Sequence, residues 1–216
     1  MSLPFMLLEL GKGFITSVVI FVLTLVFSLP LGLLISFCRR SKNFIIRMIT
    51  KFYISIMRGT PLMLQLYVVY FGPYYVFHIQ LPRSYRFIAV IIAFVLNYAA
   101  YFAEIYRSGI ESMPRGQYEA AQVLGYTKQQ TFLKIILPQV IKRVLPSITN
   151  ETITLVKDTS LAFVISIVEM FTTAKQIAAA ETTIMPLMVA GLFYYIFNLV
   201  VAVGMEYVEK KFNYYR

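Results

Sequence analysis

The chain has 216 residues, of which 59% are hydrophobic, and its mean hydropathy is +0.71. A soluble core of this size would interrupt its helices with charges every turn or two, so the composition indicates an integral membrane protein. The net charge of +10 does not indicate a nucleic-acid partner, because the basic residues lie between the hydrophobic runs, as membrane topology requires. One cysteine, Cys38, and one histidine, His78, exclude an internal disulfide and leave no metal-ligand cluster.

The predicted fold class is an all-α integral membrane protein with five membrane-spanning helices in a single domain. Three runs without Asp, Glu, Lys or Arg, at Gly13 to Cys38, Gly59 to Pro82 and Thr182 to Met205, are long enough to cross about 30 Å of hydrocarbon. The third and fourth spans contain or adjoin acidic residues and must be shielded from lipid over part of their length. In chain order the predicted spans are residues 13–38, 57–78, 86–107, 152–172 and 184–206.

The distribution of Lys and Arg predicts the orientation. Of the 20 such residues, only Lys12, Arg83, Arg86 and Lys175 fall in segments on the N-terminal side of the predicted membrane. Because Lys and Arg concentrate in cytoplasmic segments, the N-terminus is predicted to lie outside and the C-terminus in the cytoplasm. The long segment between the third and fourth spans, about residues 112–140, then faces the cytoplasm.

This cytoplasmic segment combines helical periodicity with residues that end helices. Apolar residues recur at helical spacing before and after Gly125, which can reverse the chain in a left-handed conformation. Pro138 is expected to close the second helical piece. The segment therefore predicts two short amphipathic helices at an angle, forming a compact knob; a helical pair lying on the headgroups is the alternative.

Residues 119–138 resemble the EAA motif of the membrane subunits of ABC importers. The match consists of Glu119-Ala120-Ala121, then Gly125, then Ile135 and Leu137-Pro138, at the spacing of that motif. In that family the loop forms a coupling helix that docks in a groove of the ATP-hydrolysing subunit. For Glu119 the alternative is a place on a solvated helix face. The resemblance implies a role in coupling to the ATPase for these residues: Glu119, Ala120, Ala121, Gly125, Leu137 and Pro138.

Three more segments resemble one branch of that family, the permeases for polar amino acids such as histidine, arginine and glutamine. They are Arg58 to Pro61, Ala103 to Ile110 and Lys157 to Leu161; Ser108, where the branch often has glycine, is a minor departure. The resemblance covers roughly residues 10–210. It implies a bacterial plasma (inner) membrane location, an amino acid substrate and an extracytoplasmic amino-acid-binding protein as a partner.

Absent motifs set the remaining expectations about partners. No G-x-x-x-x-G-K-[ST] phosphate loop occurs in the sequence, so the chain is not predicted to be an enzyme or to bind a cofactor. ATP and Mg are expected on two separate ABC ATPase subunits. A single five-span copy forms half of a translocation path in the family, which implies a second permease copy. A homodimer is preferred, because symmetric pairs are the default, and a heterodimer with a sister permease is the alternative.

The predicted substrate-binding residues lie near the inner ends of the third and fourth spans. If the third span starts at Phe87, Glu104 lies about 26 Å along it, and Asp158 lies about 21 Å from the outer end of the fourth, so the two carboxylates are expected at one level. Thr159 and Ser160 are interpreted as a helix start whose amides, at Ser160 and Leu161, would hold a substrate carboxylate. A cationic group would lie near Glu104 or Asp158, and Asn97 adds a hydrogen-bonding group.

Ion pairing is the alternative reading of these acidic residues. Glu104 and Arg107 are three residues apart on a helix and can pair with each other. Asp158 can pair with a partner subunit or cap a helix end. Two acidic groups favour a basic amino acid as the substrate. The competing function is an ATP-independent, ion-coupled carrier or channel in which Glu104 and Asp158 bind protons or cations.

Overall fold

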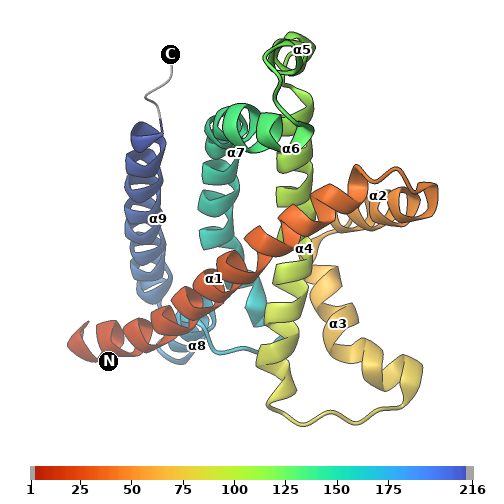
Figure 1. Cartoon of the computed structure of the whole chain (residues 1–216). Helices are drawn as coiled ribbons and strands as arrows, with labels where there is room; N and C mark the ends of the chain where they lie inside the picture. Colours follow the sequence, from red (N-terminus) through yellow and green to blue (C-terminus); the bar gives the residue numbers. More distant parts are fainter. Residues whose placement is uncertain (1–2, 213–216) are drawn as a thin grey trace.

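The computed structural model describes residues 3–212, and all regular structure within this range is helical (Figure 1). Three helices, α1, α4 and α9, are long and apolar enough to cross a membrane, and α3 is a shorter apolar helix. The all-helical membrane class is therefore confirmed. In chain order the elements are α1 (Leu3–Arg39), α2 (Phe44–Gly59), α3 (Leu62–Phe77), α4 (Tyr85–Glu111), α5 (Arg115–Val123), α6 (Lys128–Gln130), the π-helical turn η1 (Thr131–Ile136), α7 (Leu137–Asp158), the 3₁₀ segment η2 (Thr159–Ile165), α8 (Met170–Ala180) and α9 (Met185–Lys211).

Two of the predicted spans are not continuous helices in the structure. Residues 57–78, predicted as one span, contain the end of α2, a break at Thr60 and Pro61, and then α3. Residues 152–172, predicted as another, contain the end of α7, the whole of η2, a left-handed residue at Ser166 and the start of α8. Hydropathy averages over a window and does not register such breaks, which depend on local backbone hydrogen bonding.

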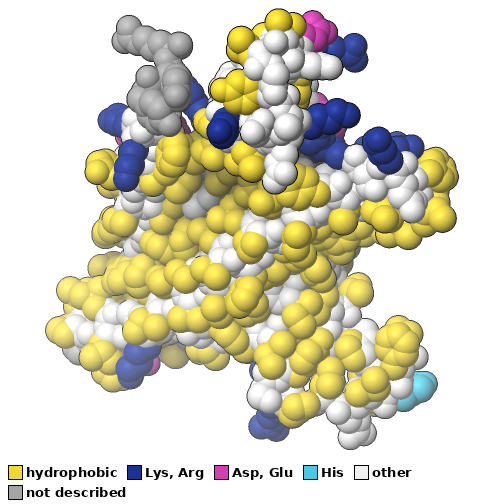
Figure 2. Space-filling view, in the orientation of Figure 1, with side chains coloured by type: hydrophobic (Ala, Val, Ile, Leu, Met, Phe, Trp, Pro, Cys, Tyr) yellow, Lys and Arg dark blue, Asp and Glu magenta, His cyan; other side chains and the backbone are white. Residues whose placement is uncertain are grey.

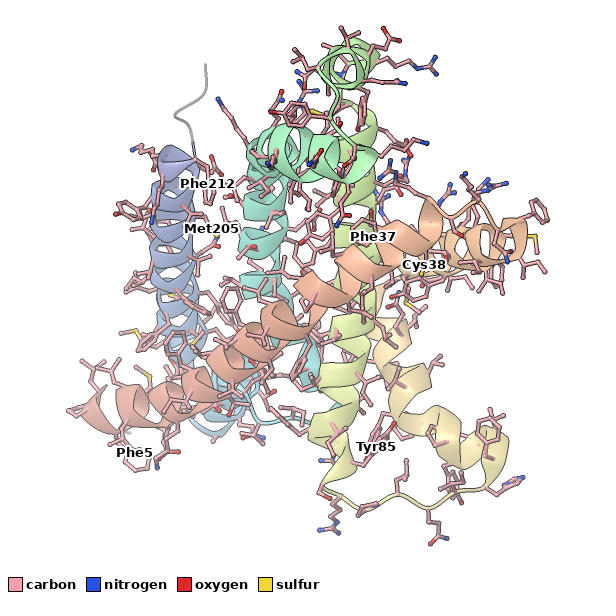
Figure 3. All side chains as sticks on the ribbon, viewed as in Figure 1. Phe5, Phe37, Cys38, Tyr85, Met205 and Phe212 are labelled. Atoms are coloured by element: carbon pink, nitrogen blue, oxygen red, sulfur yellow. The ribbon has the colours of Figure 1, made fainter. Side chains whose placement is uncertain are left out.

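The helix α1 crosses α4 at close range, running from Phe5 to Cys38 in Figure 3. Its buried face is mostly small: Ser28, Gly32 and Ser36 follow one another at four-residue spacing and are buried. A Cβ atom added at Gly32 would lie 2.8 Å from the Cβ of Phe102 and 3.0 Å from the carbonyl oxygen of Ala99, both in α4. Small residues at such a crossing allow two membrane helices to approach until their backbones touch.

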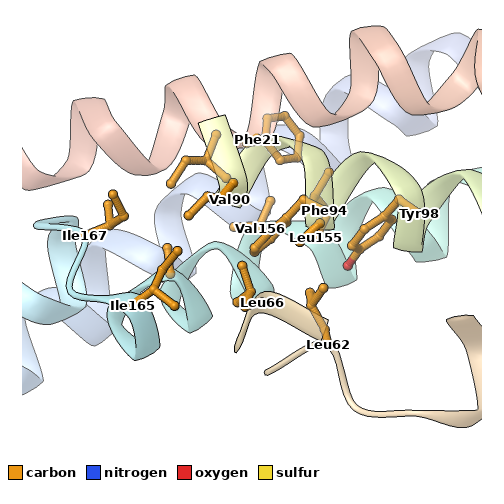
Figure 4. Close-up of a cluster of buried hydrophobic side chains, with 14 of the residues drawn as sticks. Phe21, Leu62, Leu66, Val90, Phe94, Tyr98, Leu155, Val156, Ile165 and Ile167 are labelled. Atoms are coloured by element: carbon orange, nitrogen blue, oxygen red, sulfur yellow. The ribbon is translucent and has the colours of Figure 1, made fainter. Parts of the chain in front are cut away.

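The main apolar core forms where α1, α3, α4, α7 and η2 meet (Figure 4). Phe94 and Tyr98 of α4 pack there with Leu66 of α3 and Leu155 of α7, and all four are almost completely buried. Tyr98 contributes its ring to this core while its hydroxyl reaches the edge. The core therefore fixes one polar group at a known position beside α7.

The ends of the molecule differ in charge. α5 lies at one end of the long axis of α4, whereas the N-terminal part of α1 and α8 lie toward the other, and α9 returns to the α5 end (Figure 1). On the face drawn in Figure 2, hydrophobic side chains cover the middle, and most Lys and Arg side chains gather toward the α5 end. This arrangement matches a membrane band with a basic surface on one side of it.

Candidate functional site

A cavity of about 450 Å³, called the first cavity below, lies where α3, α4, α7 and η2 meet. Three of the predicted substrate-binding residues line it: Asn97, Asp158 and Leu161. Ser160 lines none of the cavities described here, and Glu104 lines a neighbouring one. The complete lining of the first cavity is Thr60, Pro61, Leu62, Asn97, Tyr98, Tyr101, Glu151, Thr154, Asp158 and Leu161.

Two carboxylates of α7 face the first cavity. Asp158 accepts a hydrogen bond of 2.7 Å from the hydroxyl of Tyr98, and Glu151 lies seven residues earlier on the same helix face. No ion pair is recorded for either carboxylate within residues 3–212. The cavity can therefore accept a cationic group. Sequence reasoning missed Glu151, although its helical spacing from Asp158 was a signal that could have found it.

The side chain of Asn97 forms hydrogen bonds with the junction between α2 and α3. Its amide nitrogen donates to the carbonyl oxygen of Met57 and to Oε1 of Gln65, each at 3.0 Å. Gln65 in turn donates to the carbonyl oxygen of Thr60 at 3.1 Å. These bonds satisfy carbonyl groups that the end of α2 leaves without helical partners. Asn97 thus shapes the wall of the first cavity with its donor hydrogens already used.

Glu104 is paired within its own helix. It forms an ion pair with Arg107, which also pairs with Glu111, as the spacing of these residues along the helix allows. Glu104 also lies six residues beyond Tyr98, the partner of Asp158, which is about 9 Å along α4. Glu104 and Asp158 therefore line two neighbouring cavities, and their position at one level stays a prediction.

Glu104 lines a second cavity of about 420 Å³ between α4 and α7, nearer the α5 end. Tyr101 and Glu151 line both cavities, so the two adjoin each other. Arg58, at the end of α2, reaches this second cavity and its guanidinium carbon lies 5.3 Å from the centre of the Tyr101 ring. The second cavity therefore contains basic and acidic side chains together.

Thr159 and Ser160 do not start a helix. Thr159 donates its hydroxyl to the carbonyl oxygen of Val156, and Ser160 donates to that of Lys157, both at 2.8 Å. The Thr159 amide also bonds the carbonyl of Leu155, so the chain passes from α7 directly into η2. The amides of Ser160 and Leu161 therefore lie within a helical run and not at its positive end, so the expectation that they form an anion site at a helix start is wrong.

The helix N-terminus in this part of the fold is that of α8, and Glu169 caps it. Its carboxylate accepts from the amides of Phe171 and Thr172, each at 2.7 Å, and from the hydroxyl of Tyr194 at 3.0 Å. Glu169 is fully buried. The acidic residue that interrupts the fourth predicted span therefore has a structural explanation, because a capping carboxylate compensates the free amides of the first turn.

The segment of residues 112–140 forms the predicted knob at one end of the molecule (Figure 1). Glu119 and Ala120 on α5 are exposed, whereas Ala121 is buried. Gly125 has a φ of 80° and reverses the chain, as its left-handed conformation was expected to do. Beside it Val123 and Leu124 are 88% and 74% exposed, which leaves an apolar surface at the tip.

The base of the knob is fixed by paired side-chain amides. Gln117 of α5 and Gln139 of α7 exchange two hydrogen bonds of 2.8 and 2.7 Å. Leu137 and Pro138 follow directly on the π-helical turn η1 in the first turn of α7, so the chain stays helical through Pro138, contrary to the expectation that this proline closes a helix. The amide of Leu137 bonds the carbonyl oxygen of Phe132, five residues earlier, so the wide π-helical turn lies directly before the proline, which itself has no amide hydrogen to donate.

Comparisons with known proteins agree with this architecture. Residues 28–214 match the family described as "Binding-protein-dependent transport system inner membrane component". The putative glutamine transport system permease protein GlnP of Rickettsia bellii is 38% identical over 192 residues, which cover 88% of this chain and 86% of that protein. The arginine transport system permease protein ArtQ of Bacillus subtilis is 37% identical over 211 residues, covering 97% and 93%.

A solved structure supports the same conclusion. The crystal structure of an amino acid ABC transporter with histidines contains a chain that superposes with a TM-score of 0.85 at 29% identity, covering 94% of each chain. The family match spans most of the sequence, and the relatives are matched over most of their own length. The chain therefore belongs to the family of binding-protein-dependent transport system inner membrane components, as its resemblance to ABC importer permeases led us to expect.

Proposed function

We propose that the chain is the membrane-spanning permease of an ATP-driven importer for a polar, basic L-amino acid. The observation that carries this proposal is the first cavity, where Asp158 and Glu151 face a volume of about 450 Å³ without a recorded ion pair. Carboxylates at such depth are costly unless a cation compensates them. A substrate with a positively charged group provides this compensation while it is bound.

The bound amino acid is oriented by the walls of this cavity. Asp158, held by Tyr98, binds the cationic group, and Glu151 stands at the border toward the second cavity. Asn97 acts as a positioning residue for the wall at Met57, and Leu161 supplies an apolar contact. Glu104 acts farther along the path, since its ion pair with Arg107 keeps it from being a free acceptor.

Five crossings are assigned by combining α1, α3, α4, the α7–η2 unit and α9, with the N-terminus outside and the α5 end in the cytoplasm. Support comes from the gathering of Lys and Arg at the α5 end in Figure 2. Four basic residues were expected outside; they belong to α1, the α3–α4 loop, the start of α4 and α8, and are Lys12, Arg83, Arg86 and Lys175 in that order. Arg216, counted among the cytoplasmic charges, lies outside the described residues. The compartment proposed is the bacterial inner membrane.

The knob couples the permease to a separate ATPase. Its exposed Glu119 and Ala120, the turn at Gly125 and the apolar tip at Leu124 suit insertion into a groove of a partner protein. Leu137 and Pro138 connect this knob to α7, which lines the first cavity. Movement of the knob would therefore reach the substrate through one continuous helix.

The assembly proposed contains two ABC ATPase subunits, which use ATP and Mg, two copies of this permease, and an extracytoplasmic amino-acid-binding protein. A homodimer agrees with the general preference of protein oligomers for symmetric pairs of identical chains. Closure of the ATPases on ATP opens the path to the outside, where the binding protein delivers substrate, and hydrolysis resets the path inward.

The test is uptake in proteoliposomes that contain this chain and its ATPase, with the binding protein added. The expected result is uptake of arginine, lysine or histidine that requires ATP. Asp158→Asn should reduce it by about tenfold or more, because a hydrogen bond to a charged group contributes about 1.5–3 kcal/mol. The matched control is Glu206→Gln, which removes an exposed carboxylate of α9 that lines neither cavity, and should leave uptake unchanged.

Two results would contradict the proposal. Uptake that proceeds with the chain alone, driven by a membrane potential and indifferent to ATP, would establish the ion-coupled carrier instead. Equal loss of basic and neutral amino acid uptake on Asp158→Asn would refute the assignment of a basic substrate to the first cavity.

A further inference from the structure

The polar surface of α7 extends beyond the first cavity. Five polar residues of α7 follow one another at spacings of three or four residues, so they lie on one helix face. They are Arg143, Ser147, Glu151, Thr154 and Asp158. All five line either the first or the second cavity. From Arg143 to Asp158 the helix rises by 15 steps, which is about 22 Å. A polar track of this length exceeds what one amino acid occupies, and the substrate site in the first cavity uses only part of it.

The second cavity has the dimensions and chemistry of a binding site of its own. Its volume of about 420 Å³ falls within the range of about 300–1,000 Å³ typical of small-molecule pockets. Arg58 and Arg143 line it together with Glu104 and Glu151, so both signs of charge face one space. An amino acid carries a carboxylate and an ammonium group a few bonds apart, and this combination of side chains is complementary to it.

Arg58 is the group in this cavity best suited to receive a carboxylate. Its guanidinium carbon lies 5.3 Å from the centre of the Tyr101 ring. Within residues 3–212 the structure shows no ion pair of Arg58. Packing against an aromatic ring leaves the edge of the guanidinium, with its parallel N–H groups, free for a bidentate carboxylate. Arg107 is unsuited to this role because Glu104 and Glu111 already pair with it.

Arg143 and Glu151 complete the arrangement. Arg143 donates one hydrogen bond of 2.7 Å to the carbonyl oxygen of Ser112, which fixes the side chain and leaves further donors available. Glu151 lines both cavities, so its carboxylate stands at their border. A cationic group that leaves Asp158 therefore meets Glu151 next along α7.

We propose that the second cavity is a separate binding site for the transported amino acid, in which Arg58 and Arg143 bind the α-carboxylate and Glu151 binds the cationic group. This inference rests on the proposed function, since it takes the substrate from the first cavity. The amino acid occupies the second cavity after it leaves Asp158 and before it reaches the α5 end of the molecule.

The test counts bound amino acid on the purified complex of the permease with its ATPase. The probe is radiolabelled arginine, lysine or histidine, whichever supports the greatest ATP-driven uptake, measured by equilibrium dialysis. The wild type should bind two molecules per permease chain. Asp158→Asn should retain the second site, and the double variant Arg58→Gln with Arg143→Gln should retain the first and weaken the second by about tenfold or more.

Two controls make the result specific. Arg47→Gln removes an arginine of α2 that lines neither cavity and should leave two molecules bound. The decarboxylated amine of the same amino acid should displace one bound molecule and not the other, because the second site is defined by its carboxylate contacts.

One bound molecule per chain in the wild type, lost completely on Asp158→Asn, would overturn the second site. Uptake by the same preparations separates this outcome from failure of the proposed function. If the wild type imports with ATP and binds one molecule per chain, the second site alone is refuted. If uptake does not require ATP, the proposed function fails and this inference fails with it.

Discussion

Replacement of Gly32 by alanine tests the closest contact in the fold, the crossing of α1 and α4. The added Cβ would lie 2.8 Å from the Cβ of Phe102, 3.0 Å from the carbonyl oxygen of Ala99 and 3.2 Å from the amide nitrogen of Ala103. Two of these three atoms belong to the backbone of α4, so no change of rotamer relieves the contact. The two helices must separate, and the packing around the crossing is loosened.

The magnitude follows from two opposing effects. Overpacking of a tight site costs about 1–3 kcal/mol, and a contact against backbone belongs in the upper half of that range. Alanine in place of glycine recovers up to about 1 kcal/mol of helix preference. The net loss is about 1–2 kcal/mol, which for a chain of this size lowers Tm by about 2–8 °C.

The assay is thermal unfolding of the purified protein in detergent, followed by circular dichroism because the chain contains no tryptophan. Gly11→Ala is the matched control, since Gly11 lies on the same helix and a Cβ there meets nothing within 4 Å. It should leave Tm unchanged or raise it by up to about 4 °C. A rise in Tm with Gly32→Ala, or equal shifts with both variants, would refute the close crossing.

Two further changes test the first cavity and the knob. Tyr98→Phe removes the hydroxyl that donates to Asp158 and should raise KM for basic amino acid uptake about tenfold, measured in proteoliposomes; an unchanged KM would show that this hydrogen bond does not orient the carboxylate. Gly125→Ala places a side chain at a φ of 80°, so the ATP-driven uptake rate should fall and the free energy of unfolding decrease by about 1 kcal/mol. Gly116→Ala, in the same segment with open space around it, should leave the uptake rate unchanged and should not lower the free energy of unfolding.

Hydropathy predicted the long apolar helices well because composition controls them. α1 and α4 each contain a predicted span, α9 contains all but the first residue of another, and the periodic segment with Gly125 forms the expected knob. Hydropathy could not locate the break after Asp158, where α7 passes into η2 and then into a bend at Ser166. Such a break depends on which backbone groups find partners in three dimensions, and the window average contains no such information.

The sequence predicted only some residues of the candidate site, because residue types along the chain are visible in it and contacts between helices are not. Asp158 and Asn97 were identifiable as polar residues within apolar surroundings. The pairing of Glu104 with Arg107 was predictable from their spacing of three residues on a helix, and the structure contains this pair. Tyr98 was not singled out, because a tyrosine among apolar residues is ordinary until a carboxylate from another helix lies 2.7 Å from its hydroxyl.

The sequence by itself determined that this protein is helical and embedded in a membrane, and its motifs identified its family, since both depend on residue types at fixed intervals along the chain. Only the tertiary structure decided that Glu151 and Asp158 share a cavity with Asn97 of another helix, and that Arg58 reaches a second one beside it. The grouping of α4 with α7 depends on their close approach at small residues such as Gly109, where an added Cβ would collide with the side chain of Val144, because small residues control the distance between helix backbones.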